Sequence, residues 1–250
     1  MRLAIGVEYD GSRYSGWQFQ PHAPSIQEGL NKALSFVASS DINCVGAGRT
    51  DSGVHATGQV AHFDAPVYRE PHAWLMGVNS YLPDDICALW VQPVEDNFHA
   101  RFTAIGRTYF YKILNRKVRS PLSRDRSWWI HKELDARSMQ LAAECLIGEN
   151  DFSAFRASSC QSHSPFRNLS TLKVVRDREY IHIVCSANSF LHHMVRNIVG
   201  SLVRVGNGDA DLNWIKEVLE SRDRRLSGIT APASGLTLTH IDYPSGILDN

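Results

Sequence analysis

Hydrophobic and polar positions follow two kinds of periodicity along this 250-residue chain. In the opening run RLAIGVEYD, every second residue from Leu3 to Tyr9 is apolar, which predicts a strand that ends at the turn DGS. Farther on, Ser25 and Glu28 have the spacing of a capping box, and apolar residues then recur at helical spacing as far as Val37. The chain therefore begins with a strand followed by a helix.

Segments with strand periodicity and segments with helix periodicity continue to alternate as far as the C-terminus. The glycine-punctuated loop GAGRTDSGVHATG precedes a short strand, a helix at about 74–81 and the strand ICALWVQPV. Later segments predict a strand in TYFYKIL, a helix near 135–147, strands at LSTLKVV and YIHIVCSA, and a helix at about 189–205. A helix in DLNWIKEVLES and a strand in LTLTHIDY complete the pattern.

Strands and helices interleaved in two halves predict an α+β protein made of two units of the ferredoxin or RNA-recognition type. We expect an N-terminal domain over 1–105 and a C-terminal domain over 106–250, each with a mainly antiparallel sheet. No Pro-rich linker separates the halves, so the sheets are expected to pack or merge around a central cleft.

Composition predicts a globular protein of the cytoplasm. The chain is 43% hydrophobic, but no run approaches the roughly 20 apolar residues of a membrane-spanning helix, and no secretory signal is recognisable. Its five cysteines are widely spaced without a C-x-x-C pair, which argues against a disulfide framework and against a zinc knuckle.

A formal net charge of zero conceals a basic segment at 101–126, where eight Lys and Arg residues face Asp125 alone. Its cations are Arg101, Arg107, Lys112, Arg116, Lys117, Arg119, Arg124 and Arg126. Such a run is often only a solvated surface. Aromatic residues such as Phe102 and Tyr109 interrupt this one, and cations mixed with aromatics favour contact with RNA phosphates and bases.

The loop GAGRTDSGVHA places one carboxylate, Asp51, between Arg49 and His55. The letters TDSG by themselves describe an ordinary turn. Arg49 would nevertheless keep Asp51 ionised, as a carboxylate nucleophile must be. The loop has no second acid for glycoside hydrolysis, no acidic cluster for a two-metal nuclease, and no phosphate-binding glycine pattern.

The segment FLHHMVRNIVG lies on the helix expected at 189–205, where His192 and Arg196 would share a face. The adjacent His192 and His193 would point about 100° apart, and no third ligand is evident, so packing or RNA contact is favoured over a metal site. Arg196 on an otherwise apolar helix needs an anionic partner, which Asp51 could provide.

Tyr109 begins the face of a predicted strand that also carries Tyr111 and Ile113. Both a core position and a base-stacking role fit that placement. Arg101 in NFHARFTA and Arg156 in FSAFRASSCQ are further loop cations, of the kind found on most protein surfaces as well as in RNA-binding sites.

Seven ordered blocks through nearly the whole chain resemble the tRNA pseudouridine synthase A family. They are VEYDGSRYSGWQFQ, SIQEGLNKAL, GRTDSGVHATGQVAHF, NFHARFTA, RTYFYKI, GENDFSAFRA and ANSFLHHMVRNIVGSL. One departure is Ser52, where the family commonly has Ala, a small residue in either case.

The resemblance implies isomerisation of uridine to pseudouridine at positions 38, 39 and 40 of the tRNA anticodon stem-loop, by a homodimer without a metal or other cofactor. By motif, Asp51 would be the nucleophile, Arg49 would help extrude the base, Tyr109 would pack against the uracil, and Arg196 would pair with Asp51. We expect the substrate-binding residues to include four cationic or titratable side chains: His55, Arg101, Arg107 and Arg156.

The chemistry is compatible with that implication, because the rearrangement consumes no water, electrons or phosphate. Asp51 could add to uracil C6 or act at the ribose anomeric carbon, and the sequence leaves both routes open. The enzyme would flip the uridine out of the RNA stack. A non-catalytic RNA-binding protein and a metal-dependent nuclease using His192 and His193 remain as alternatives.

Overall fold

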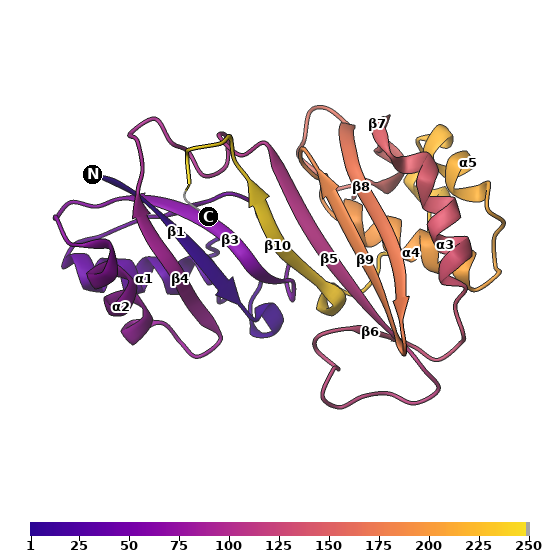
Figure 1. The fold of residues 1–250 in the computed structure, drawn as a ribbon, viewed down its shortest axis with the longest axis horizontal. Coiled ribbons are helices and arrows are strands. Elements are labelled where there is room, and N and C mark those ends of the chain that lie inside the picture. Colours follow the sequence, from indigo (N-terminus) through magenta and orange to yellow (C-terminus); the bar gives the residue numbers. More distant parts are fainter. Residues whose placement is uncertain (249–250) are drawn as a thin grey trace. The chain divides into compact units, whose positions relative to one another are not determined.

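The computed structural model describes residues 1–248. The chain divides into two compact units (Figure 1). Unit 1 comprises Met1–Gly106 and the residues from Thr237 onward, and unit 2 comprises Arg107–Leu236. Within residues 1–248, no helix has both the length and the apolar character needed to cross a membrane.

Unit 1 contains a sheet with the strand order β4-β1-β3-β10, and its helices α1 and α2 pack together. Strands β3 and β4 pair antiparallel with β1, β2 pairs antiparallel with β3, and β10 runs parallel to β3. The elements are β1 (Arg2–Tyr9), the 3₁₀ turn Gly11–Arg13, α1 (Ile26–Ala38), β2 (Val45–Gly46), β3 (His55–Asp64), α2 (Pro71–Tyr81), β4 (Ile86–Pro93) and β10 (Leu236–Asp242).

Strand β1 is buried on both faces, whereas its alternating sequence predicted one buried face. The apolar face from Leu3 to Val7 is fully buried, as expected. On the opposite face Gly6 lies against the indole of Trp90, and a Cβ at this position would fall 2.2 Å from the Trp90 Nε1. The side chain of Trp90, on the neighbouring strand β4, therefore covers the face of β1 that the alternating pattern predicted to be exposed.

Helix α1 begins with the predicted Ser25 cap, whereas the carboxylate of Glu28, the other member of the capping box, pairs with Lys32 at 2.7 Å. The Oγ of Ser25 accepts a hydrogen bond from the backbone N–H of Glu28 at 3.3 Å, which satisfies one of the donors exposed at a helix start. Ser39 ends the helix in the left-handed region, at φ 54°.

Unit 2 contains a sheet in the order β5-β9-β8-β7, with all three of these pairings antiparallel, and β6 runs parallel to β5. Helix α3 packs on α4 and on β8, beside α5 (Figure 1). The elements are β5 (Gly106–Asn115), β6 (Trp128–Ile130), α3 (Ala136–Ala143), β7 (Gly148–Asp151), β8 (Phe166–Asp177), β9 (Tyr180–Ala187), α4 (Met194–Gly206) and α5 (Trp214–Ser221). Short 3₁₀ helices occur at Glu144–Leu146, Ser153–Phe155, Arg224–Leu226 and Ala233–Gly235.

These elements confirm the α+β class and the mainly antiparallel sheets. One expected helix is shorter than predicted, because α4 begins at Met194 and not near residue 189. His193 precedes it with φ 61°, a left-handed conformation that cannot continue a right-handed helix. The prediction that His192 and Arg196 share a helix face is therefore wrong.

The last strand belongs to a different unit from the one its position in the chain indicated. We expected residues 106–250 to form one domain, but β10 pairs in parallel with β3, with Thr237 opposite His55 and Leu238 opposite Ala56. Local sequence carries no record of a parallel partner almost the whole chain away, so this return to unit 1 was not predictable from patterning.

Candidate active site

Asp51 lies in the loop between β2 and β3, where its side chain is half-buried. Its backbone carbonyl accepts a hydrogen bond from the N–H of Val54 at 3.1 Å, which closes a turn over DSGV. Gly53 adopts φ 77° within that turn, a conformation that glycine tolerates without steric cost. The ordinary turn indicated by the residue types is present, and it presents a carboxylate.

The opening segment of the chain holds this turn. The N–H of Trp17 donates to the Thr50 carbonyl at 3.0 Å, and the Tyr14 carbonyl accepts from Gly53 N–H at 3.3 Å. Gly16 has φ 98°, and a Cβ there would lie 2.5 Å from the Thr50 carbonyl oxygen. The backbone of this segment thus approaches the residue before Asp51 as closely as glycine permits.

A buried side-chain contact joins the loop that carries Asp51 to strand β1. The hydroxyl of Tyr9, at the end of β1, lies 2.8 Å from Oγ1 of Thr50, and both residues are buried. Burial raises the pKa of Tyr9, so its phenol stays protonated and able to donate. On the other side of the loop, Nε2 of Gln59 donates to the Gly48 carbonyl at 2.8 Å. Asp51 is therefore carried by a rigid support.

The two neighbours of Asp51 that the sequence singled out lie differently. Arg49 is exposed. His55 is only 3% exposed, its Nδ1 lies 3.1 Å from Oδ1 of Asp10, and the N–H of Gly11 donates to the same nitrogen at 3.2 Å. His55 thus lies beneath the loop and ties it to the turn that follows β1.

In unit 2, Tyr109 lies on β5, on the strand face whose later residues are buried, but it is itself partly exposed. Tyr111 and Ile113 follow it at strand spacing and are fully buried, whereas Tyr109 is half-buried. The ring of Phe190 meets Tyr109 edge to face, with centroids 5.1 Å apart and an interplanar angle of 87°. The Tyr109 ring is therefore fixed in orientation while part of it stays accessible.

Arg196 lies in the first turn of α4. Its Nε donates to the Ala231 carbonyl at 2.7 Å, and the Ala231 N–H donates back to the Arg196 carbonyl at 3.1 Å. Tyr111 is close enough for the Arg196 charge to act on it, although burial dominates and raises the pKa of Tyr111. The Tyr111 hydroxyl donates to the Pro232 carbonyl at 2.8 Å, next in the chain to Ala231.

A buried network that the sequence did not reveal holds the segment bonded to Arg196. Asn197 is fully buried, and its Oδ1 accepts hydrogen bonds from Thr230 at 2.7 Å and from Arg224 at 3.0 Å. Arg224 also donates to the Gly228 carbonyl at 3.0 Å. A Cβ on Gly200 would fall within 2 Å of the Ile229 carbonyl, so the segment lies directly against α4. The asparagine of HHMVRN and the following glycine were the only signals in the sequence.

The remaining predicted RNA-binding cations are individually anchored. Arg107 donates to the Asn188 carbonyl at 3.0 Å, and Arg156 donates to the carbonyls of Cys160 and Ser162, each at 2.7 Å. Arg101, in unit 1, lies over the ring of Phe102, with its guanidinium carbon 5.5 Å from the centroid. These contacts hold each of the three cations at a defined place on its unit.

Part of the basic segment is neutralised locally. Arg116 pairs with Glu179 at 3.0 Å, and Arg124 pairs with Asp125 at 2.8 Å. The exposed Lys117 and Arg119 lie between them. The segment is therefore less uniformly basic than its local charge implied.

Comparison with known proteins identifies the relationship of the whole chain. The family model described as tRNA pseudouridine synthase matches residues 5–103 and 142–244. The chain belongs to this family. The matched ranges include the Asp51 loop and helix α4, whereas Tyr109 lies between them.

Curated members of the tRNA pseudouridine synthase family match along almost the full length. Proteins named tRNA pseudouridine synthase A from Glaesserella parasuis and Vibrio parahaemolyticus are each 51% identical over 98% of this chain, covering 93% and 92% of their own lengths. The one from Legionella pneumophila strain Lens is 49% identical over 100% of this chain and 96% of its own.

A solved structure titled "Crystal Structure of a Cbf5-Nop10-Gar1 Complex" aligns with 94% of this chain and 57% of its own. The TM-score of 0.36 and sequence identity of 9% are too low to support a conclusion about this chain.

Proposed function

We propose that this protein isomerises uridine to pseudouridine in tRNA, with Asp51 as the nucleophile. The observation that carries the proposal is the full-length similarity to proteins named tRNA pseudouridine synthase A, at about half identical residues. The Asp51 loop supports it, because a half-buried carboxylate on a rigid turn is the kind of group that covalent catalysis by an aspartate requires.

In the proposed reaction, the bond between uracil N1 and the ribose anomeric carbon breaks and a bond from C5 to the same carbon forms. The proton at C5 is lost, and N1 gains a proton. Asp51 either adds transiently to uracil C6 or bonds transiently to the anomeric carbon, and it is released unchanged in both routes. The substrate uridine is flipped out of the RNA stack so that these atoms become accessible.

We assign the following roles to the other site residues. Tyr109 packs against the flipped uracil with the accessible part of its ring, and Arg49 contacts the RNA from its exposed position. Arg196 acts as the cationic partner of Asp51, held in orientation by Ala231. His55 is assigned a positioning role, because it is buried beneath the loop. Arg101, Arg107 and Arg156 contact the RNA.

The proposal extends to the target and the assembly. We assign the activity to positions 38, 39 and 40 of the anticodon stem-loop, to a homodimer, and to the cytoplasm. Transcripts that carry uridine at one of the three positions, with cytidine at the other two, test the first assignment. Light scattering tests the second, because a homodimer has twice the mass of the 250-residue chain.

The decisive experiment measures tritium release from a tRNA transcript labelled at uridine C5, under single-turnover conditions without added metal. The wild type is compared with Asp51→Ala and with Asp84→Ala, the same substitution at an exposed aspartate outside the loop. We expect release by the wild type and by Asp84→Ala, and none by Asp51→Ala.

Binding of the same transcript distinguishes the alternatives. RNA binding without tritium release by the wild type would favour a non-catalytic RNA-binding protein. Release by Asp51→Ala would place the nucleophile elsewhere. RNA cleavage that a chelator suppresses would support a metal-dependent nuclease.

A further inference from the structure

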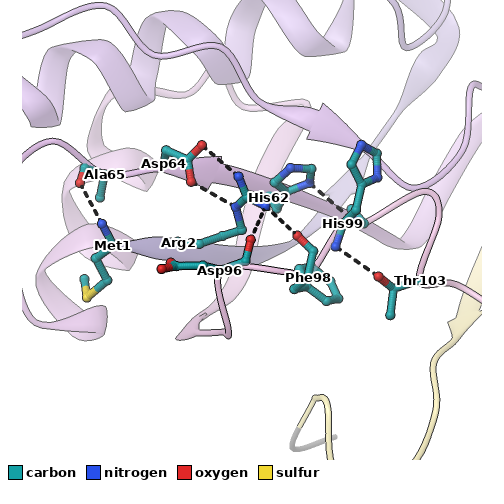
Figure 2. A network of polar contacts seen from close by, with 10 residues as sticks. Met1, Arg2, His62, Asp64, Ala65, Asp96, Phe98, His99 and Thr103 are labelled. Atoms are coloured by element: carbon teal, nitrogen blue, oxygen red, sulfur yellow. Dashed lines mark hydrogen bonds and ion pairs between the residues drawn. The ribbon is translucent and has the colours of Figure 1, made fainter.

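In unit 1, the loop Phe98–Thr103 after β4 is pinned to the sheet. Figure 2 shows Arg2 on β1 at the centre of these contacts. Its Nη1 donates to the Phe98 carbonyl at 2.9 Å, while Nε and Nη2 hold the carboxylate of Asp64 at 2.9 and 3.0 Å. The Arg2 guanidinium lowers the pKa of Asp64, so this pair stays charged. The start of the loop is thereby fixed to two neighbouring strands.

Two further contacts fix the middle of the loop. Nδ1 of His62, on β3, accepts the N–H of Ala100 at 3.1 Å, and the Tyr243 hydroxyl donates to the Ala100 carbonyl at 2.7 Å. Both the donor and the acceptor of this peptide residue are therefore satisfied by side chains of unit 1. Ala100 itself is fully buried.

His99 organises the tip of the loop. Its Nδ1 accepts the N–H groups of Arg101 and Phe102, both at 3.2 Å, so this nitrogen carries no proton. Its backbone N–H donates to Oγ1 of Thr103 at 3.0 Å (Figure 2), and its carbonyl accepts the Thr103 N–H at 2.9 Å. The tip is a closed turn with a defined geometry.

This rigid turn displays an aromatic ring to solvent. Phe102 is 75% exposed, although a phenylalanine in a packed loop would normally be buried. Its ring stacks on His99, with centroids 4.3 Å apart and an interplanar angle of 30°, and His99 in turn lies 4.7 Å from the ring of His62. Arg101 lies over the Phe102 ring at 5.5 Å. The rings of His62, His99 and Phe102 thus form a series of contacts from β3 to the solvent, where Arg101 adds a positive charge.

We propose that Phe102, supported by His99 and flanked by Arg101, is a stacking platform for an unpaired nucleobase of the RNA substrate. An exposed aromatic ring offers a flat apolar face, and an adjacent guanidinium offers a phosphate contact, which together match single-stranded RNA. Because the turn is already fixed, binding orders few groups and costs little conformational entropy. The proposal rests on the proposed function only for the identity of the RNA.

A second exposed aromatic residue of unit 1 provides the contrast. Tyr68 is 74% exposed, but its hydroxyl donates to the carboxylate of Glu70 at 2.5 Å, so an acid lies at the polar end of its ring. Its negative neighbour disfavours RNA, and it has no aromatic residue stacked against it among the ring contacts of residues 1–248. Tyr68→Ala is therefore a control with matched exposure.

The test measures the dissociation constant of a tRNA anticodon stem-loop for the wild type and for Phe102→Ala, Phe102→Leu, Phe102→Trp and Tyr68→Ala. We expect Phe102→Ala and Phe102→Leu to weaken binding about 5- to 150-fold, the range that stacking of one base accounts for. Phe102→Trp should retain wild-type affinity, because it preserves the flat ring, and Tyr68→Ala should have no effect.

Three outcomes would overturn the platform. The first two are unchanged RNA affinity in Phe102→Ala and retained RNA affinity in Phe102→Leu. The third is a substitution of Phe102 that changes the molecular mass of the free protein but not its RNA affinity, which would make Phe102 a contact between copies. Thermal melts confirm that each variant is folded. The proposed function fails separately, since it depends on tritium release by the wild type and the platform depends on RNA affinity alone.

Discussion

Tyr9 and Thr50 join the first strand of the protein to the loop that carries Asp51. Their side-chain oxygens lie 2.8 Å apart in a buried environment, so the residue before the proposed nucleophile is held directly by the sheet. We expect Tyr9→Phe to destabilise the protein by about 1–2 kcal/mol, because it leaves Oγ1 of Thr50 buried without this partner. Denaturant titration measures the change.

The double variant Tyr9→Phe/Thr50→Val provides the control for that contact. Removing both partners of a buried hydrogen bond costs less than removing one. We therefore expect the double variant to be less destabilised than the sum of the two single changes, and simple additivity would show that the contact contributes little.

Gly16→Ala should destabilise the protein by at least about 2 kcal/mol, because φ 98° is strained for alanine and its Cβ would lie 2.5 Å from the Thr50 carbonyl oxygen. Gly48→Ala is the matched control within the same region, since a Cβ there meets no atom within 4 Å and its φ is not in the left-handed range. Equal melting temperatures for the two variants would contradict this explanation.

Tyr109→Phe should reduce tritium release less than Tyr109→Leu. The ring is fixed edge to face against Phe190, and phenylalanine preserves its flat surface, whereas leucine removes it. Single-turnover rates at saturating RNA measure the difference. Equal loss in both variants would mean that the hydroxyl, and not the ring, carries the effect.

Arg224→Ala should destabilise unit 2 by about 2–3 kcal/mol, because it removes hydrogen bonds to Asn197, Gly228 and Thr230 in a largely buried network. Tritium release should fall as well, since this network holds the segment that orients Arg196. The neighbouring Arg225→Ala breaks only an exposed pair with Asp223 and should leave both properties unchanged.

Acid should destabilise unit 1 through His62. The pKa of His62 is lowered from 6.5 to about 4, first by burial and then by the charges of His99 and Arg2, which Asp64 partly opposes. Between these two values the unfolded chain binds a proton that the folded protein excludes, so stability is complete above about pH 6.5 and falls as the pH approaches 4. The full shift corresponds to about 3 kcal/mol, which solvent screening reduces to a loss on the order of 2 kcal/mol.

The variant His62→Asn isolates that contribution. Its side-chain oxygen can still accept the Ala100 N–H, but asparagine does not titrate. The free energy of unfolding of this variant should depend less on pH between about pH 7 and pH 4.5 than that of the wild type. Parallel curves for the two proteins would assign the acid sensitivity to other groups.

Local structure was readable from the sequence where neighbours along the chain decide it. The Ser25 cap of α1 and the buried stripe of β5 at Tyr111 and Ile113 depend on residues two to four positions apart, and both are confirmed. The start of α4 was not readable, because apolar spacing continues through residues 190–193 although His193 adopts a left-handed conformation.

In the candidate site too, the sequence predicted some features and not others. Asp51, Arg49, Tyr109 and Arg196 were selected from motifs that resemble those of the family, and their roles stay predictions. The buried position of His55 was not evident, because the same letters describe an exposed and a buried turn histidine. Whether a residue faces solvent depends on which distant segment covers it.

By itself, the sequence determined the α+β class, most strands and helices, and the family, because each is written in local periodicity or in ordered motifs. Only the tertiary structure decided that Tyr9 holds Thr50, that β10 returns to lie beside β3, and that Asn197 and Arg224 support Arg196. These relations join residues far apart along the chain or buried under other elements. They depend on which surfaces meet when the chain packs, and local spacing does not encode that.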